Sequence, residues 1–486
     1  MNMNIGLSDI LLVSPMIALF LASLVPITAK VLRGNREQSP IITLCQALIG
    51  IVIAIGLLVV FGGAGKTAFN NGLIFDGVTQ WMGVIALFAA GASMVMMYEN
   101  PATTGRQFSE LIFLAMSSAV GMLILVSAVD LLMVFIGLEM MSLALYLMIA
   151  MSHEEKLSKE AALKYFILGS FASAIFLYGV AFIFGTTGGT NILSFMENAA
   201  ELVQTSRMFL FGMVFVILGF CFKVSIAPFH AWTPDVYQGS PTPHTAFMAT
   251  AVKTVSFAAF LRVIATRSLV GSDHLFDMLQ WLAVITMIVG NTAAILQNNF
   301  KRMIAYSSVA HSGYVLVGVI TAGVSDDAAF GASGVIFYLL SYGLMTLGAF
   351  AIASMIEKSE NHIVNIDDLA GFAKQRPMMA LCLTVFLLSL AGIPPTLGFF
   401  GKFYLFNAAI GEGLLWLAVW GMISSVISVY YYLRPIVVMY MKEGDADVAE
   451  HSLNATTVAV VVMALAIMFL GFVSGPLFAA VEKSLL

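Results

Sequence analysis

Long apolar runs, separated by short polar segments, make up most of this chain. Each run is about 20 residues or longer, which is the length that an α-helix needs to cross the hydrocarbon core of a bilayer. None shows the alternation of apolar and polar residues that marks a barrel strand. Because only helices and closed barrels satisfy their backbone hydrogen bonds in lipid, the pattern predicts an all-α polytopic membrane protein.

The apolar runs predict about 14 transmembrane helices, of which the twelfth is interrupted. They lie near residues 8–29, 41–62, 79–98, 110–129, 131–151, 160–185, 207–228, 243–267, 276–297, 302–323, 328–356, 377–410, 413–440 and 455–480.

Composition narrows the class of protein further. Of the 486 residues, 60% are hydrophobic and only 10% are charged, whereas soluble domains carry about 25% charged residues. Water-soluble enzymes, nucleic-acid-binding proteins and disordered scaffolds are therefore excluded. Cys45, Cys221 and Cys382 all lie in apolar runs without CxxC spacing, so we expect neither a disulfide framework nor a metal or cofactor site from them.

The distribution of positive charges predicts the orientation. With the N-terminus outside, the inside loops hold the larger group of Lys and Arg, namely Lys30, Arg33, Arg36, Arg106, Lys156, Lys159, Lys301, Arg302, Lys358, Lys374, Arg376, Arg434 and Lys442. The outside loops then hold Lys66, Arg207, Arg262, Arg267 and Lys483. By the positive-inside rule, both termini lie outside and the number of spans is even.

The positive residues left over fall within the predicted spans: Lys164, Lys223, Lys253 and Lys402. Glu139 lies at similar depth in the fifth span. A charge near the bilayer centre costs roughly 2.5–3.5 kcal/mol, so it is seldom kept without a use or a partner. A buried lysine balanced between desolvation and a neighbouring carboxylate can bind and release a proton. We therefore favour an ion pathway over a purely structural pairing.

Two of the candidates keep alternative interpretations. Lys164 is only a few residues inside the sixth span, so it is also explained as an interfacial anchor. His311 lies mid-span in the segment Ser307–Tyr314, whose hydroxyls and imidazole suit a proton wire. A single hydrogen-bonded core histidine explains His311 equally well.

Helix-breaking residues interrupt two spans, at Pro228 and at Pro394-Pro395. Paired interrupted helices at corresponding positions are typical of transporters built on inverted repeats. We expect a single membrane domain, 1–486, with three N-terminal helices in 1–109 and a C-terminal helix at 455–480. Two inverted five-helix repeats, 110–267 and 276–440, would each contain one broken helix.

Four motifs together carry a family resemblance that covers about residues 80 to 440. They are Leu138–Tyr146, Phe222–Pro243, Ala249–Lys253 and Gly398–Tyr404. In these segments the chain resembles the antiporter-like subunits of NADH:quinone oxidoreductase (respiratory complex I). The sequence Asp-Val-Tyr followed by Gly-Ser-Pro, at 235–241, is similar to the N type of subunit.

The resemblance implies a role for each matching residue. Glu139 and Lys223 would form a modulating ion pair, Lys253 would be the central relay lysine, and Lys402 would be the terminal lysine of the second half-channel. Lys164 matches an inner-side lysine less securely. The subunit would translocate protons as part of a proton-pumping NADH:quinone oxidoreductase, without redox chemistry of its own.

The resemblance also implies the surroundings of the chain. NADH, FMN, iron–sulfur clusters and quinone would bind to partner subunits, and none would bind here. The partners would be other membrane-arm subunits, with M-type and K-type neighbours, and the lipid bilayer, with no nucleic acid. The location would be the bacterial inner membrane, with both termini periplasmic.

Three alternatives remain open from the residues. The chain could be a subunit of an Mrp-type cation/proton antiporter, which shares the buried lysines. It could also be an inert structural part of a membrane arm, or belong to a related redox-driven complex with another electron donor.

Overall fold

The computed structural model describes residues 6–104, 107–151, 156–196, 198–264, 273–325, 328–357, 364–444 and 454–485. Up to the first proline-containing break, its elements are α1 (Leu7–Leu12), α2 (Ser14–Leu32), α3 (Pro40–Phe61), β1 (Lys66–Ala68), β2 (Leu73–Phe75), α4 (Gly77–Glu99), α5 (Phe108–Ser127), α6 (Leu131–Met151), α7 (Lys156–Thr187), α8 (Ile192–Met196), α9 (Ala199–Thr205) and α10 (Arg207–Lys223).

The remaining elements complete the chain. They are α11 (Trp232–Gly239), α12 (Thr242–Phe247), the π-helix η1 (Met248–Val252), α13 (Lys253–Ile264), α14 (Asp273–Ile295), α15 (Phe300–Val324), α16 (Ala328–Ile356), the 3-10 helix η2 (Ile366–Leu369), α17 (Phe372–Gln375), α18 (Pro377–Ala391), α19 (Leu397–Gly411), α20 (Leu415–Met441), α21 (Ala455–Phe472) and α22 (Ser474–Lys483).

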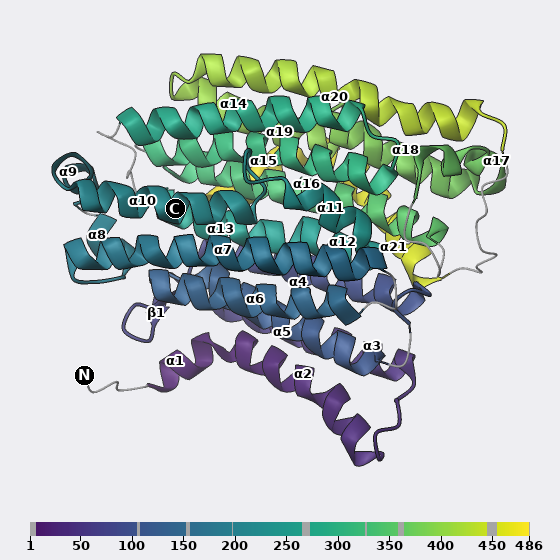
Figure 1. Cartoon of the computed structure of the whole chain (residues 1–486), viewed down its shortest axis with the longest axis horizontal. Coiled ribbons are helices and arrows are strands. Elements are labelled where there is room, and N and C mark those ends of the chain that lie inside the picture. The colour runs from purple at the N-terminus through teal and green to yellow at the C-terminus, as the bar shows by residue number, and fades with distance from the viewer. Residues whose placement is uncertain are drawn as a thin grey trace.

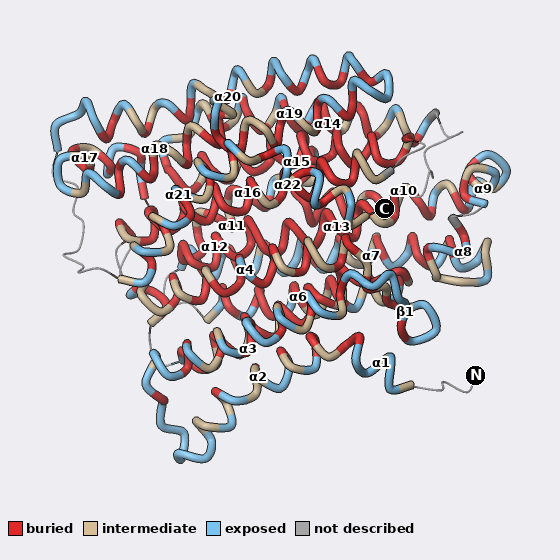
Figure 2. The backbone as a smooth tube through the Cα atoms, turned by 180° about the vertical axis from the view of Figure 1, so that it is seen from behind, coloured by how far each residue is buried: buried red, intermediate tan, exposed pale blue. Residues whose placement is uncertain are grey.

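The long helices run roughly side by side across the molecule (Figure 1). Helices α4, α13, α15 and α16 form the interior, whereas α2, α3 and α20 lie at the edges with much of their surface exposed (Figure 2). The span that contains α12, η1 and α13 is 94% buried, compared with 28% for α2. A charge carried by this central span is therefore far from both water and lipid.

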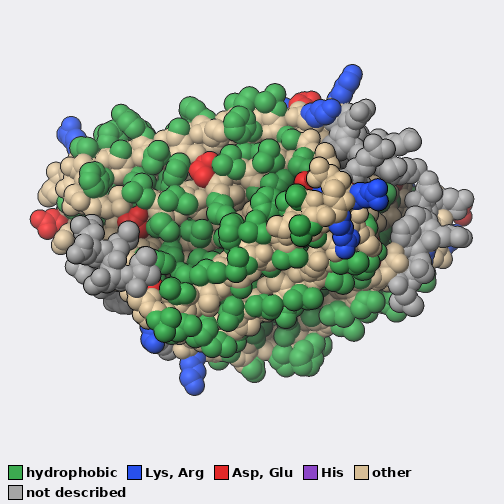
Figure 3. Space-filling view, turned by 90° about the horizontal axis from the view of Figure 1, so that it is seen from below, with side chains coloured by type: hydrophobic (Ala, Val, Ile, Leu, Met, Phe, Trp, Pro, Cys, Tyr) green, Lys and Arg blue, Asp and Glu red, His purple; other side chains and the backbone are tan. Residues whose placement is uncertain are grey.

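The exposed surface is apolar, as lipid contact requires. Large hydrophobic side chains such as Ile53, Leu147 and Val426 are about half exposed or more, and hydrophobic residues cover much of the face in Figure 3. Within the described residues, 12 helices are long and apolar enough to cross a membrane. The predicted class, an all-α polytopic membrane protein, is confirmed.

The two other predicted spans, 207–228 and 377–410, are interrupted at their prolines. Helix α10 ends at Lys223, and α11 begins only at Trp232, beyond Pro228. Helix α18 ends at Ala391, and α19 begins at Leu397, beyond Pro394 and Pro395. Proline has no amide hydrogen to donate and clashes with the preceding turn, so it favours a break at both places.

A short hairpin closes one end of the molecule. Strands β1 and β2 pair antiparallel, and Trp81 Nε1 of α4 donates a hydrogen bond to Ser484 Oγ at 2.9 Å, just after α22. The first and last described residues lie toward the same end of the helices (Figure 1). Of the positive residues used to predict the orientation, Arg106, Arg267 and Lys358 lie outside the described residues.

Candidate functional site

Lys223, at the end of α10, is held by hydroxyl groups. Its Nζ donates to Ser142 Oγ of α6 at 2.6 Å and to Tyr165 OH of α7 at 3.1 Å. Among the ion pairs of the described residues, none joins it to Glu139, whose carboxylate accepts a hydrogen bond from Ser173 Oγ. In this state the two predicted partners are therefore separated.

A small cavity lies beside Lys223 and beside Ser173, the residue that donates to Glu139. It has a volume of about 20 Å³, and its lining includes Ser142, Ser173 and Lys223. A volume of this size accommodates about one water molecule with polar partners. Ser173 and one water could therefore connect the Glu139 carboxylate to the Lys223 ammonium without a direct ion pair.

Lys253 is the first residue of α13, directly after the π-helical turn η1. Its Nζ donates to Ser308 Oγ at 2.5 Å, to the Ser308 carbonyl at 2.7 Å and to Ser312 Oγ at 2.9 Å. Ser312 Oγ also donates to the carbonyl of Val224 at 2.5 Å. Because Val224 follows Lys223 directly, Ser312 connects the central lysine to the first helix break.

The ring of His311 lies at the centre of a group of tyrosines. Its Nδ1 is 2.5 Å from Tyr338 OH and its Nε2 is 2.9 Å from Tyr432 OH; Tyr432 OH also forms a hydrogen bond with Ser307 Oγ. The His311 ring centroid lies 5.0 Å from that of Tyr342 and 5.5 Å from that of Tyr314.

Tyr342 lies near Lys253, whereas Tyr314 lies near Lys402. Tyr342 OH donates to Ser308 Oγ at 2.8 Å, and Lys253 Nζ lies 5.6 Å from the Tyr342 ring centroid. Lys402 Nζ lies 5.1 Å from the Tyr314 ring centroid. His311 is therefore placed between the two buried lysines.

Lys402, in α19, closes the gap left by the second helix break. Its Nζ donates to the carbonyls of Leu390 and Ala391 at 2.9 and 3.0 Å, and to Ser425 Oγ at 2.8 Å. The C-terminal carbonyls of a helix carry partial negative charge, which stabilises an ammonium group there. The broken helix α18 thus supplies the partners of the lysine that follows it.

Lys164 lies apart from this group. Its side chain is 42% exposed, and its Nζ forms ion pairs with Glu160 at 2.8 Å and Asp235 at 2.9 Å. Asp235 is also paired with Arg302 at 2.7 Å. This position matches the interfacial anchor interpretation better than a group at mid-depth.

Arg262, expected in an outside loop, lies instead in α13, and Lys301, expected in an inside loop, is buried in a helix. Lys301 lies in the first turn of α15, and its side chain, like that of Glu357, has no exposed surface. The two form an ion pair at 3.1 Å. Lys301 and Glu357 stand at the ends of two apolar runs and are 56 residues apart, so the linear pattern could not reveal their pairing. Their polarity beside long apolar runs was the only available signal.

Helix α16 carries a regular series of side chains toward this ion pair. Tyr338, Tyr342, Thr346, Phe350 and Ser354 follow at every fourth residue, so each lies next to the following one while the series turns by about 40° per step around the helix. All are buried. Phe350 is the only apolar member, so it interrupts the polar series between Thr346 and Ser354.

The described residues contain no group of three or more His, Cys, Asp and Glu side chains arranged to hold a metal ion. The site brings together ammonium, hydroxyl, imidazole and carboxylate groups, all of which can take part in proton transfer.

Comparisons with known proteins agree with this geometry. Residues 128–428 match the family model described as NADH:quinone oxidoreductase/Mrp antiporter. NADH-quinone oxidoreductase subunit N of Bdellovibrio bacteriovorus is 87% identical over 486 residues, which is 100% of both chains.

Solved structures give the same result at the level of the fold. A chain of respiratory complex I from Thermus thermophilus matches with a TM-score of 0.82 and 31% identity, over 96% of this chain and 99% of that one. A chain of the Mrp complex from Dietzia sp. has a TM-score of 0.83 at 19% identity, over 99% of this chain and 97% of that chain, which shows a shared fold alone.

Proposed function

The chain belongs to the family of NADH-quinone oxidoreductase subunit N, and on that premise we propose that protons cross it through Lys223, Lys253, His311 and Lys402. Within complex I it is a proton-pumping, antiporter-like subunit of the membrane arm. The 87% identity to a subunit N over the whole chain favours this over the Mrp-type alternative.

The single observation that carries the proposal is the position of His311. Through Tyr342 it faces the hydroxyl groups that hold Lys253, and through Tyr314 it faces Lys402. A neutral imidazole can accept a proton at one nitrogen and release one from the other. In this scheme a proton leaves the Lys253 ammonium through the hydroxyls of Ser308 and Tyr342, and water would complete the step to His311. His311, whose two ring nitrogens bond the Tyr338 and Tyr432 hydroxyls, relays it toward Lys402.

The first half of the path is assigned a switching role. When Glu139 is apart from Lys223, as in this structure, the ammonium is held by neutral hydroxyls alone. A carboxylate that approaches the ammonium stabilises its charged form, and one that withdraws destabilises it. Movement of Glu139 relative to Lys223 would therefore control when the proton is passed on.

We assign the driving chemistry to other subunits. NADH, FMN, iron–sulfur clusters and quinone would bind there, and M-type and K-type membrane subunits would be the direct neighbours of this chain. We place the chain in the bacterial inner membrane with both termini on the periplasmic side, as the distribution of positive loop residues favours.

The test is proton pumping by the intact complex in membrane vesicles that carry Lys223→Ala. We expect pumping to fall strongly while the complex still assembles, as judged on a native gel. Lys374→Ala is the matched control, because Lys374 is an exposed lysine in α17. Unchanged pumping in Lys223→Ala with intact assembly would contradict the proposal.

A further inference from the structure

The span that carries Lys253 is attached at its two ends by two separate ion pairs. At the end where α12 begins, the Glu357 carboxylate accepts from the backbone amide of Thr242 at 3.1 and 3.2 Å. Lys301 Nζ donates both to Glu357 at 3.1 Å and to the carbonyl of Ser240 at 2.6 Å. Together these bonds hold the residues that connect α11 to α12.

At the other end of the span, Arg262 of α13 binds Asp76. The guanidinium donates to both carboxylate oxygens, at 2.6 and 2.8 Å, and its Nε donates to the Val126 carbonyl at 2.9 Å. This is the bidentate geometry that makes Arg–carboxylate pairs directional.

Both attachments lead to the same neighbouring helix, α4. Asp76 is its N-cap residue, and Asn100 is its C-cap residue. Asn100 Nδ2 donates to Glu357 Oε2 at 2.7 Å and to Ser354 Oγ at 2.8 Å. Helix α4 has 23 residues, and the Lys253 span, Thr242–Ile264, also has 23. The two therefore match in length and are joined at both ends.

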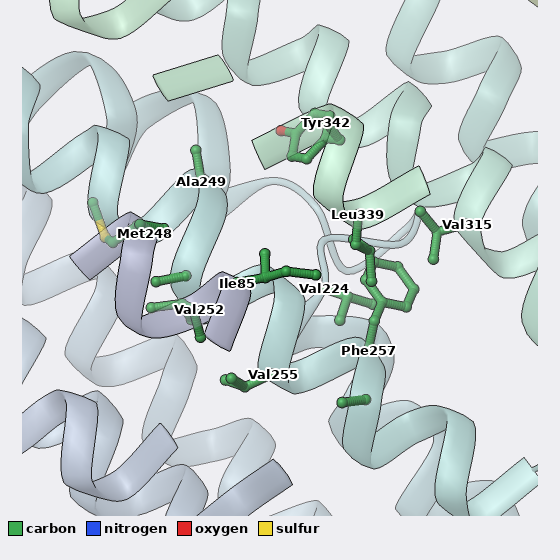
Figure 4. Packing of buried hydrophobic residues seen from close by; sticks show 14 of the residues in the cluster. Ile85, Val224, Met248, Ala249, Val252, Val255, Phe257, Val315, Leu339 and Tyr342 are labelled. Atoms are coloured by element: carbon green, nitrogen blue, oxygen red, sulfur yellow. The ribbon is translucent and has the colours of Figure 1, made fainter. Parts of the chain in front are cut away.

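Between the two attachments the contact is apolar. Helix α4 packs against α12, η1 and α13, and Figure 4 shows Ile85 of α4 beside Val252 of the π-helical turn. Apolar packing is not directional, so these side chains alone do not determine how far the span slides or rotates. The polar bonds at its ends do.

The ion pair also connects the Lys253 span to the helix that receives the lysine. Lys301 lies on α15, and Ser308 and Ser312 follow it by 7 and 11 residues, a spacing that returns to the same helix face. The connection before α12 and the Nζ of Lys253 are thus bound to one face of α15. A shift at Ser240 would move Lys253 relative to its serine partners.

We propose that Glu357, with Lys301 and Asn100, positions Lys253 for proton transfer by fixing the start of its helix against α4 and α15. These are positioning residues, because the bonds described above join them to the start of the span and not to the Lys253 ammonium. A π-helical turn has a wider and less stable hydrogen-bond pattern than an α-helix and is frequent at functional sites. The turn directly before Lys253 is the part of the span most able to change shape when the attachment is lost. The inference rests on the proposed role of Lys253.

The experiment uses the whole complex in proteoliposomes and measures protons pumped per NADH oxidised. For Glu357→Gln we expect at least a threefold fall in this ratio, with normal assembly and normal NADH oxidation by a water-soluble electron acceptor. Amide hydrogen exchange in 242–252 should rise at the same time. The conservative Lys301→Arg variant should keep most of the pumping, because it keeps the charge and the donors.

Two further variants separate a loss of positioning from a failure of the complex to assemble. If Glu357→Gln fails to assemble because Lys301 is left buried without a counter-charge, the double variant Lys301→Met/Glu357→Gln removes both charges and should also lose pumping. Asp367→Asn is the matched control, since Asp367 pairs with Lys442 on an exposed surface and its side chain is 68% exposed.

Lys253→Ala is measured in parallel to separate the two proposals. If it pumps normally, the proposed function fails. If Lys253→Ala abolishes pumping while Glu357→Gln and the double variant pump normally, with unchanged exchange in 242–252, the positioning role is overturned and the proposed function stands.

Discussion

The three buried lysines at the site differ in what holds their ammonium groups. Lys223 is bound by two hydroxyls, Lys253 by two serine hydroxyls and a carbonyl, and Lys402 by two helix-terminal carbonyls and a hydroxyl. None has a carboxylate within ion-pair distance among the described residues. A proton on any of them is therefore held by dipoles that remain when it leaves, which suits a relay better than permanent pairing does.

The hydroxyl oxygen of Tyr432 offers a test of the proposed proton relay. This hydroxyl joins His311 Nε2 to Ser307 Oγ, and Tyr432→Phe removes it with little change of shape. We expect pumping to fall by roughly tenfold or more, because a positioned proton-transfer group contributes about 10²–10⁴-fold to a rate. Tyr430→Phe on the same helix is the control, since Tyr430 is 64% exposed. Equal pumping in the two variants would remove Tyr432 from the path.

A substitution at Gly392 would test how closely the chain packs around Lys402. The φ of Gly392 is +86°, and a Cβ there would lie 3.1 Å from Lys402 Cδ and 3.2 Å from Nζ. Gly392→Ala should therefore destabilise the protein by about 1–2 kcal/mol for the left-handed backbone and displace the ammonium. The midpoint temperature of thermal unfolding and the rate of proton pumping should both fall. Gly56→Ala, in an open position of α3, should lower neither one.

At the scale of whole elements, the apolar pattern predicted the spans and the two breaks well, because lipid forces the chain into long apolar helices. It could not predict that Thr242–Ile264 and α4 are joined at both ends. Those links depend on Asp76, Asn100 and Glu357, which lie at the margins of apolar runs and resemble ordinary loop residues in the sequence. Glu139 was found from its depth in α6, whereas its separation from Lys223 depends on side-chain packing that no pattern encodes.

The Asp76–Arg262 link should give α4 a pH-dependent contribution to stability. Burial alone would raise the pKa of the Asp76 carboxyl, but Arg262, together with the backbone and hydroxyl of Thr79, holds it below its ordinary value of 3.8. A carboxyl with a depressed pKa stabilises the fold above its unfolded-state pKa, and this contribution is lost as the pH falls through the folded-state value.

Asp76→Asn should therefore lower the midpoint temperature of thermal unfolding near neutral pH. The free energy of unfolding should fall by roughly 1.5–3 kcal/mol. The difference from the unaltered protein should shrink below about pH 4, as the native carboxyl becomes protonated. Thermal unfolding across pH 3 to 7 measures this. Glu201→Gln, at an exposed position in α9, should show no such difference; a gap that stays constant down to pH 3 would refute the assignment.

At the scale of the molecule, the orientation can be tested with single cysteines. A cysteine in place of Lys66, in the hairpin that closes one end, should react with a membrane-impermeant thiol reagent from the periplasmic side. A cysteine in place of Lys442, beyond α20, should react only in inverted vesicles. The native Cys221 and Cys382 are buried, and Cys45, which is exposed on α3, is replaced by serine in both variants to limit background labelling. The reverse pattern would invert the proposed topology.

The phenylalanine at 350 has a consequence for the complex when it is idle. Moving one proton across a potential of 100 mV is worth about 2.3 kcal/mol, so an uninterrupted wire would let the gradient discharge. The buried Phe350 ring lies between Thr346 and Ser354, which are roughly 12 Å apart along the helix, and a bare charge is costly in an apolar interval. We expect this ring to act as electrical insulation, so that the resting complex keeps the voltage that its turnover has built.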